Sequence, residues 1–207
     1  MPTLYSLKPR FQALLRPLVK RIADAGISAN QITLLAAIIS AIAGAGIIWS
    51  DSRQAFLILP VWFLLRMGLN AIDGMLAREF GQKSTLGAYL NELCDVVADA
   101  ALIAPFALVA PFAPAWVFAV IFLAALSEYA GVMGPLAGAG RRYDGPFGKS
   151  DRALVIGALG MWVGIGGPLP PWTAWIMPVL ALLLAVTVLN RVRNGVAEAA
   201  ASSKEPQ

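Results

Sequence analysis

The sequence predicts an all-α integral membrane protein with six transmembrane helices and an amino-terminal interfacial amphipathic helix. Three observations support this fold class. Of the 207 residues, 58% are hydrophobic and only 14% are charged, whereas a soluble domain is about 45–50% apolar and about 25% charged. The apolar residues form long runs, many of a length that crosses a bilayer as a helix. The basic residues gather in a few connecting segments, as positive-inside loops do.

Residues 7–22 are predicted to form the interfacial helix. Apolar residues recur there at the spacing of one helical face, namely Phe11, Leu14, Leu15, Leu18, Val19 and Ile22. Basic residues surround this face, namely Lys8, Arg10, Arg16, Lys20 and Arg21. A cationic amphipathic helix suits an anionic membrane surface. The alternative, a soluble helix packed on a core, fits poorly with the apolar runs that follow.

Six spanning helices are expected between residues 31 and 190, as one bundle in a single domain. We place them at 31–50, 55–77, 84–109, 114–136, 151–168 and 172–190, given about 20 apolar residues for each crossing. The fifth is short and rich in glycine, so its limits are the least defined. The tail 191–207 is small and polar and is expected to be disordered.

The basic residues also predict an orientation. The amino-terminal segment, the loops 78–83 and 137–152 and the tail are basic, whereas the loops near 51–54, 110–113 and 169–171 hold only Asp51 and Arg53. All basic connections therefore fall on one side together with both termini. By the positive-inside rule that side is cytoplasmic, and we expect the protein in a bacterial inner membrane with its active site facing the cytoplasm.

Composition excludes several kinds of chemistry. The chain has no histidine and one cysteine, Cys94, which excludes histidine bases, histidine zinc sites and an internal disulfide framework. The basic residues form no stripe interleaved with aromatic residues, so nucleic acid is not an expected partner. Any reaction must use carboxylates, amides, hydroxyls, basic side chains or bound metal.

Polar residues cluster inside the second and third expected spans, where each charge costs about 2.5–3.5 kcal/mol on insertion scales. One helical stripe of the second span carries Arg66, Asn70 and Asp73, and a stripe of the third carries Asn91, Asp95 and Asp99, with Glu92 beside it. A short loop joins the two spans, so we expect antiparallel neighbours whose stripes face each other. Carboxylate and amide oxygens of this kind suit Mg²⁺ or Mn²⁺.

Small residues accompany the acidic ones. Gly74 and Ala77 lie next to Asp73, and Gly87 lies one turn before Asn91. Such positions permit close helix packing in membranes, or they admit a flat nucleotide beside the carboxylates.

The residues from Asn70 to Asp95 resemble the signature of the CDP-alcohol phosphotransferase family, D-x2-D-G-x2-A-R-x8-G-x3-D-x3-D. The chain reads Asn70-Ala-Ile-Asp73-Gly74-Met-Leu-Ala77-Arg78, then eight residues to Gly87, three to Asn91 and three to Asp95. The stretch Asn30-Gln31-Ile32-Thr33 is also similar to the family's Asn-x-Ile-Thr motif before the first span. The six-helix plan with an interfacial helix is shared as well.

The resemblance implies a reaction in which a hydroxyl acceptor attacks phosphorus of a CDP-linked donor and CMP leaves. It implies Asp73 as a metal ligand and Asp95 as the catalytic base and a further ligand. The remaining candidate ligands of Mg²⁺ or Mn²⁺ are Asn70, Asn91 and Asp99. It also implies a nucleotide site lined by Gly74, Ala77, Arg78 and Gly87. The expected partners are CDP-diacylglycerol or another CDP-alcohol, a hydroxyl acceptor, membrane lipids and a second copy of the chain in a homodimer.

Asn70 and Asn91 depart from the family, which has aspartates at both positions. Asparagine keeps a carbonyl ligand but removes a negative charge, and Arg66 adds a positive charge to the same stripe. Three interpretations follow: an enzyme with altered metal binding, an inactive nucleotide- or lipid-binding relative, or a shifted register that uses Asp95 and Asp99 as the last pair.

The segment 141–152 is the second informative place. Four basic residues surround a glycine-rich stretch there, and we expect them to hold a phosphate of the acceptor or of a lipid headgroup: Arg141, Arg142, Lys149 and Arg152. Ordinary positive-inside charge is the alternative.

The leading function is transfer of a phosphatidyl group from CDP-diacylglycerol to a small phosphorylated acceptor in phospholipid synthesis. The alternatives are a small CDP-alcohol donor, an inactive relative or a cation transporter.

Overall fold

The computed structural model describes residues 4–203, with side chains from residue 11 onward, and this part of the chain is helical without a β-strand. The α-helices are α1 Leu4–Asp24, α2 Ala29–Trp49, α3 Ile58–Glu79, α4 Thr85–Ile103, α5 Pro114–Leu136, α6 Lys149–Ile165 and α7 Ile176–Ser202. Short 3₁₀ turns precede or follow them: η1 Arg53–Leu57, η2 Ala104–Leu108 and η3 Pro171–Trp175. The expected all-α class is confirmed.

Four of these segments are long and apolar enough to cross a membrane: Ala29–Trp49, Arg53–Glu79, Pro114–Leu136 and Pro171–Ser202. The other two expected spans also form helices, but they differ in character. Helix α4 is continuous, but its apolar sequence contains three acidic side chains. Helix α6 has only 17 residues. The protein is therefore an all-helical membrane protein with at least four helices of spanning character.

Local sequence signals set where several helices begin and end. Ser28 and Gln31 form a capping box at the start of α2, which satisfies two of the free amides there. The Ser84 hydroxyl caps α4 by accepting from the amide of Gly87 at 2.9 Å. Helix α4 ends at Ile103 because Pro105 has no amide to donate.

Helix α2 packs against both α3 and α4, and α3 and α4 make few direct backbone contacts. The two helices face each other as expected, joined by side-chain contacts, but their backbones are not closely packed. Gly44 allows α2 to approach α4 closely, since a Cβ on Gly44 would lie 2.1 Å from the carbonyl oxygen of Ala101. The polar stripes of α3 and α4 still face one another, and long side chains bridge the space between them.

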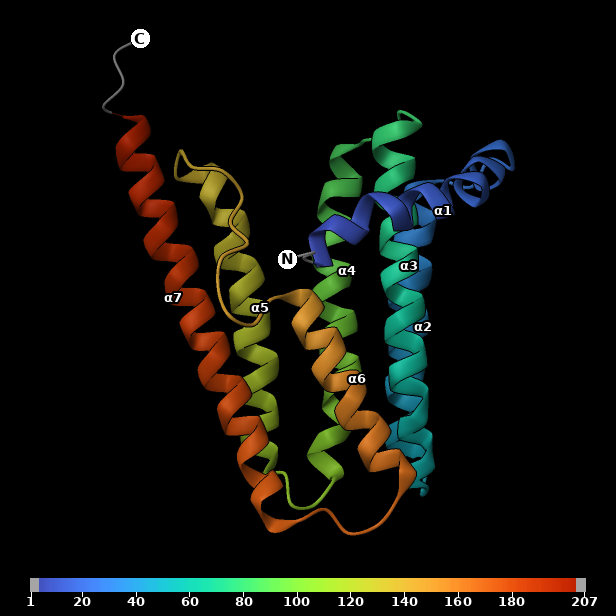
Figure 1. Cartoon of the computed structure of the whole chain (residues 1–207), viewed down its shortest axis with the longest axis vertical. Helices are drawn as coiled ribbons and strands as arrows, with labels where there is room; N and C mark the ends of the chain where they lie inside the picture. The colour runs from blue at the N-terminus through green and yellow to red at the C-terminus, as the bar shows by residue number, and fades with distance from the viewer. Residues whose placement is uncertain (1–3, 204–207) are drawn as a thin grey trace.

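The remaining helices form a second group. Helix α5 packs along α7, and α6 packs against α3 and η1. Figure 1 shows α1 lying across the end of the bundle where α2 begins. It also shows the segment between α5 and α6 running back along the bundle, so that α6 begins well below the ends of α5 and α7. The first turn of α6 therefore lies inside the bundle, among the other helices.

The tail differs from the prediction. Residues 191–202 continue α7 as a helix instead of being disordered. Arg191 and Gly195 are buried and Glu198 bonds to Arg142, so packing and ion pairs stabilise a segment that looks polar in the sequence. Residues 204–207 of the expected tail, and the side chains of Lys8 and Arg10 in the interfacial helix, lie outside the described residues.

Candidate functional site

The centre of the polar region is a buried ion pair network between α3 and α4. Arg66 of α3 is only 4% exposed. Its guanidinium donates to Oδ1 of Asp99 at 2.5 Å and to Oδ1 of Asp95 at 3.0 Å. Buried charges require such partners because desolvation is costly. The facing of the two stripes is thus confirmed, with Arg66 as the residue that joins them.

Asp73 has a different environment from the two α4 carboxylates. It is 6% exposed, and its Oδ2 accepts a hydrogen bond from the Thr33 hydroxyl at 2.8 Å. Asp73 lies on the same helical stripe of α3 as Arg66, so it faces the same side as the α3–α4 network. Asn70 lies one helical turn before it and is half-buried.

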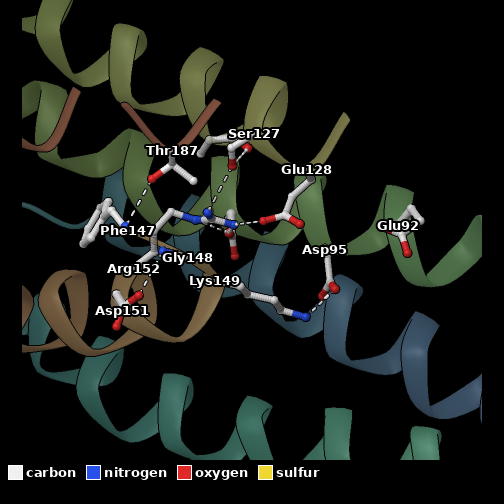
Figure 2. Close-up of polar contacts among 12 residues, drawn as sticks. Glu92, Asp95, Ser127, Glu128, Phe147, Gly148, Lys149, Asp151, Arg152 and Thr187 are labelled. Carbon is white, nitrogen blue, oxygen red and sulfur yellow. Dashed lines mark hydrogen bonds and ion pairs between the residues drawn. The ribbon is translucent and has the colours of Figure 1, made fainter. Parts of the chain in front are cut away.

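The first turn of α6 supplies two cations to the same region. Figure 2 shows Lys149 extending to Asp95 and Arg152 extending toward Glu128. Lys149 Nζ pairs with Oδ2 of Asp95. Arg152, 2% exposed, donates to Oδ2 of Asp99 at 3.0 Å and to Oε1 of Glu128 at 2.8 Å. The start of α6 is fixed in turn by Asp151, whose carboxylate accepts from the amide of Gly148 at 2.9 Å.

The network continues into α7 through Glu128 of α5. Arg191 Nη1 lies 3.5 Å from Oε2 of Glu128 and also bonds to the carbonyl oxygen of Ser127. Arg191 is 2% exposed. An alternating series of acids and bases thus connects α3, α4, α5, α6 and α7: Lys149, Asp95, Arg66, Asp99, Arg152, Glu128 and Arg191.

The loop 137–148 carries the other two basic residues. Arg141 pairs with Glu92 of α4, with one contact of 2.9 Å. Arg142 pairs with Asp144 at 2.8 Å and with Glu198 of α7. The Arg142 hydrogen bond is the main cause of a lowered pKa at Asp144. These contacts attach the loop to α4 and to the helical extension of α7.

The small residues of the expected nucleotide site line the edges of this region. A Cβ on Gly74 would lie 2.9 Å from Nη2 of Arg78, so the Arg78 guanidinium lies over the Gly74 backbone. A Cβ on Gly87 would lie 2.7 Å from Oδ1 of Asn30, which places Gly87 against the start of α2. Ala77 is half-buried on α3.

The structure brings most of the predicted site residues into one region, but it pairs them differently from the expectation. All four basic residues of 141–152 already have carboxylate partners. Within residues 4–203, no three acidic or cysteine side chains converge as a metal site. The metal, base, nucleotide and phosphate roles assigned from the sequence therefore stay predictions.

Three residues of this region were not predicted as site residues. Thr33 was considered only as part of the Asn-x-Ile-Thr motif, and Glu128 of α5 was not assigned a role. Arg191 was assigned to the tail. A signal for Arg191 existed, because Leu184, Thr187, Arg191 and Gly195 continue one buried stripe of α7 at helical spacing.

Known proteins with similar sequences include membrane proteins and lipid synthases. Inner membrane protein YnbA of Escherichia coli (strain K12) is 40% identical over 195 residues, which cover 93% of this chain and 96% of that protein. Archaetidylinositol phosphate synthase of Pyrococcus horikoshii is 27% identical, over 84% of this chain and 91% of that protein. Phosphatidylinositol phosphate synthase of Mycobacterium tuberculosis is 24% identical, over 88% and 87%.

A solved structure has the same fold. Mycobacterium tuberculosis phosphatidylinositol phosphate synthase in complex with manganese and citrate matches with a TM-score of 0.70 at 19% identity, over 86% of this chain and 87% of that chain. The same enzyme with CDP-DAG bound matches with a TM-score of 0.68. The family model described as CDP-alcohol phosphatidyltransferase matches residues 26–134, which include every signature position. The chain belongs to the CDP-alcohol phosphatidyltransferase family of membrane-bound transferases.

Proposed function

We propose that the protein transfers a phosphatidyl group from CDP-diacylglycerol to a hydroxyl of a small, phosphorylated acceptor and releases CMP. The observation that carries the proposal is the placement of Asp73 and Asp95 on the facing stripes of α3 and α4, with Gly74, Arg78 and Gly87 beside them. The similar synthases of phosphatidylinositol phosphate and the CDP-DAG complex of a structural neighbour support this donor.

Asp95 is the proposed base. It would accept the proton of the acceptor hydroxyl as that oxygen attacks phosphorus and the bond to the CMP oxygen breaks. In the structure, Lys149 and Arg66 each hold one oxygen of Asp95. The Lys149 side chain is 33% exposed, and we propose that it turns from Asp95 toward the donor diphosphate when the donor binds. That movement would leave one oxygen of Asp95 for the acceptor.

The residues present fit a divalent ion at Asp73. This carboxylate has a neutral hydroxyl partner in Thr33, and Asn70 and Asn91 supply the carbonyl oxygens that hard cations accept. These residues would hold Mg²⁺ or Mn²⁺. The oxygens of Asp95 and Asp99, the other two expected ligands, are each paired with a cation. When bound, the ion would neutralise charge that builds on the leaving phosphate.

The acceptor phosphate is proposed to bind between the loop 137–148 and the start of α6. Arg141 holds the Glu92 carboxylate with two contacts, a geometry that a phosphate group matches. Arg152 bonds to two different carboxylates, those of Asp99 and Glu128. Lys149 lies in the same turn as Arg152 and Arg142 lies beside Arg141, so the four cations frame one side of the acceptor space. A phosphate would share or displace the present carboxylate partners.

We further propose that α4 and α6 also cross the membrane, which gives six transmembrane helices, and that α1 lies in the interface. The charges of α4 are paired inside the bundle, which lowers the cost of insertion. Exposed Phe11, Leu14 and Leu18 of α1 would face lipid. Exposed tryptophans mark the opposite end, at Trp49, Trp116, Trp172 and Trp175. The basic end would then face the cytoplasm of a bacterial inner membrane.

The acceptor assignment is tested with purified protein, CDP-diacylglycerol and matched acceptor pairs, such as inositol and inositol phosphate or glycerol and glycerol 3-phosphate. Lipid product is identified by mass spectrometry. The proposal expects product only with the phosphorylated member of a pair. Product with the unphosphorylated member alone would contradict the phosphate site, and product from CDP-choline alone would contradict the donor. The size of the protein in detergent would test the expected homodimer.

A further inference from the structure

The charges around the proposed active site balance without bound metal. Apart from Arg78 beside Gly74, three carboxylates and three cations lie in this region. Arg66, Lys149 and Arg152 pair with Asp95 and Asp99. The third carboxylate is that of Asp73. The acid and the base beyond them, Glu128 and Arg191, cancel each other. Asn70 and Asn91 add no charge to either stripe. Before the donor binds, a divalent ion would therefore leave the site with an excess of positive charge, which the donor diphosphate can compensate.

The Asp95 side of the site already holds cations. Arg66 is buried and fixed by two carboxylates, with contacts of 3.0 Å to Asp95 and 2.5 Å to Asp99. Lys149 takes the other oxygen of Asp95. A divalent ion bound to Asp95 would lie beside two positive groups that the fold places there.

The Asp73 side has no such cation at contact distance. Within the described part of the chain, Asp73 forms no ion pair, and its side-chain partner is the hydroxyl of Thr33 at 2.8 Å. Asp73 is therefore the carboxylate of the two stripes that remains open to a metal.

We infer that the protein binds a single divalent ion, at Asp73, and that Lys149 and Arg66 supply the remaining positive charge to the donor diphosphate. Fixed cations are a recognised way to stabilise charge on a transferred phosphoryl group. This inference rests on the proposed function for the identity of the diphosphate. Asn70, Asn91 and Arg66 then have the same effect. The asparagines remove negative charge and Arg66 adds positive charge, so each disfavours the binding of a second divalent ion.

Metal stoichiometry tests the inference directly. The full-length protein in detergent is titrated with Mn²⁺ in the presence of CDP, and free Mn²⁺ is counted by electron paramagnetic resonance. We expect one bound Mn²⁺ per chain, with at least a tenfold loss of affinity in Asp73→Asn. Two bound ions, or no bound ion, would overturn the inference.

A pair of double variants tests the part played by Lys149. Asn91→Asp restores a carboxylate one turn before Asp95, and it is combined either with Lys149→Met or with Lys83→Met. Lys83 is exposed in the loop before α4, so both variants have the same net charge. We expect two Mn²⁺ per chain in the Lys149 variant and one in the Lys83 variant. Equal stoichiometry in the two would show that Lys149 does not replace an ion.

The same preparations separate this inference from the proposed function. CMP release together with two bound Mn²⁺ would overturn the single-ion inference and leave the transferase standing. One bound Mn²⁺ without CMP release from any CDP-linked donor would support the single-ion site and remove the transferase.

Discussion

The close approach of α2 to α4 predicts a strong effect of one added methyl group. A Cβ on Gly44 would lie 2.1 Å from the backbone oxygen of Ala101 and 2.7 Å from its carbonyl carbon. These are backbone atoms of a helix, which cannot rotate away as the end of a side chain can. In Gly44→Ala the two helices must therefore separate by an ångström or so to restore ordinary van der Waals distance.

The magnitude follows from overpacking. Inserting an extra methyl group into a well-packed region costs about 1–3 kcal/mol and occasionally more. For a protein of about this length, each kcal/mol shifts the midpoint of thermal unfolding by roughly 2–4 °C, so we expect a fall of about 2–12 °C. Ala101 lies two residues beyond Asp99 on α4. The displacement should also reduce transfer activity, because a shift of about 1 Å at a reacting group can cost about 100-fold.

The assay is thermal unfolding of the purified protein in detergent, with Gly46→Ala as the matched control. Gly46 lies on the same helix, is exposed and has no neighbouring atom within 4 Å of an added Cβ. Alanine there should leave the midpoint unchanged or raise it, because glycine is the poorer helix former by roughly 0.5–1 kcal/mol. Equal midpoints for Gly44→Ala and the wild type would refute the packing argument.

Three further predictions concern single side chains. Asp73→Asn and Asp95→Asn should each abolish CMP release while circular dichroism stays native, and full activity in Asp95→Asn would remove it as the base. Thr33→Val should lower CMP release about tenfold or more, since a hydrogen bond to a charged group contributes about 1.5–3 kcal/mol; Thr33→Ser should restore it, and equal rates in all three proteins would contradict the role. Because Arg142 lowers the pKa of Asp144, their pairing should stabilise the fold above the ordinary aspartate pKa of about 3.9 and lose this effect as the pH falls through the lower folded value. The midpoints of wild type and Asp144→Asn should then differ at pH 6 and begin to converge only below about pH 4, and a constant difference would contradict the pairing.

The sequence predicted the helices well where apolar runs have clear ends. The predicted spans 31–50 and 114–136 lie within two residues of α2 and α5, because each is an apolar run of about the length of one crossing. The tail was mispredicted because a polar composition hid the buried stripe through Arg191. The spacing of Asp73, Asn91 and Asp95 predicted facing stripes, which the contacts of Arg66 confirm.

The pairing of charges could not be predicted from the sequence. Lys149 reaches Asp95 because the segment before α6 turns back into the bundle. The long side chain of Arg152 likewise extends from α6 to Glu128 of α5. Helical periodicity assigns a residue to a face of its own helix but does not say which residue of another helix it meets. The packing of α2 against both α3 and α4 is a tertiary feature of the same kind, and a local signal for its approach to α4 is Gly44.

The central claim is that the chain is a metal-dependent transferase using CDP-diacylglycerol. The most direct measurement is CMP release from CDP-diacylglycerol by the purified protein, with Mg²⁺ or Mn²⁺ and a panel of hydroxyl acceptors, before and after chelation. We predict release that requires an acceptor, stops with chelator and returns when metal is added. Protein that binds CDP but releases no CMP with any acceptor or any CDP-alcohol would contradict the claim and identify an inactive member of the family.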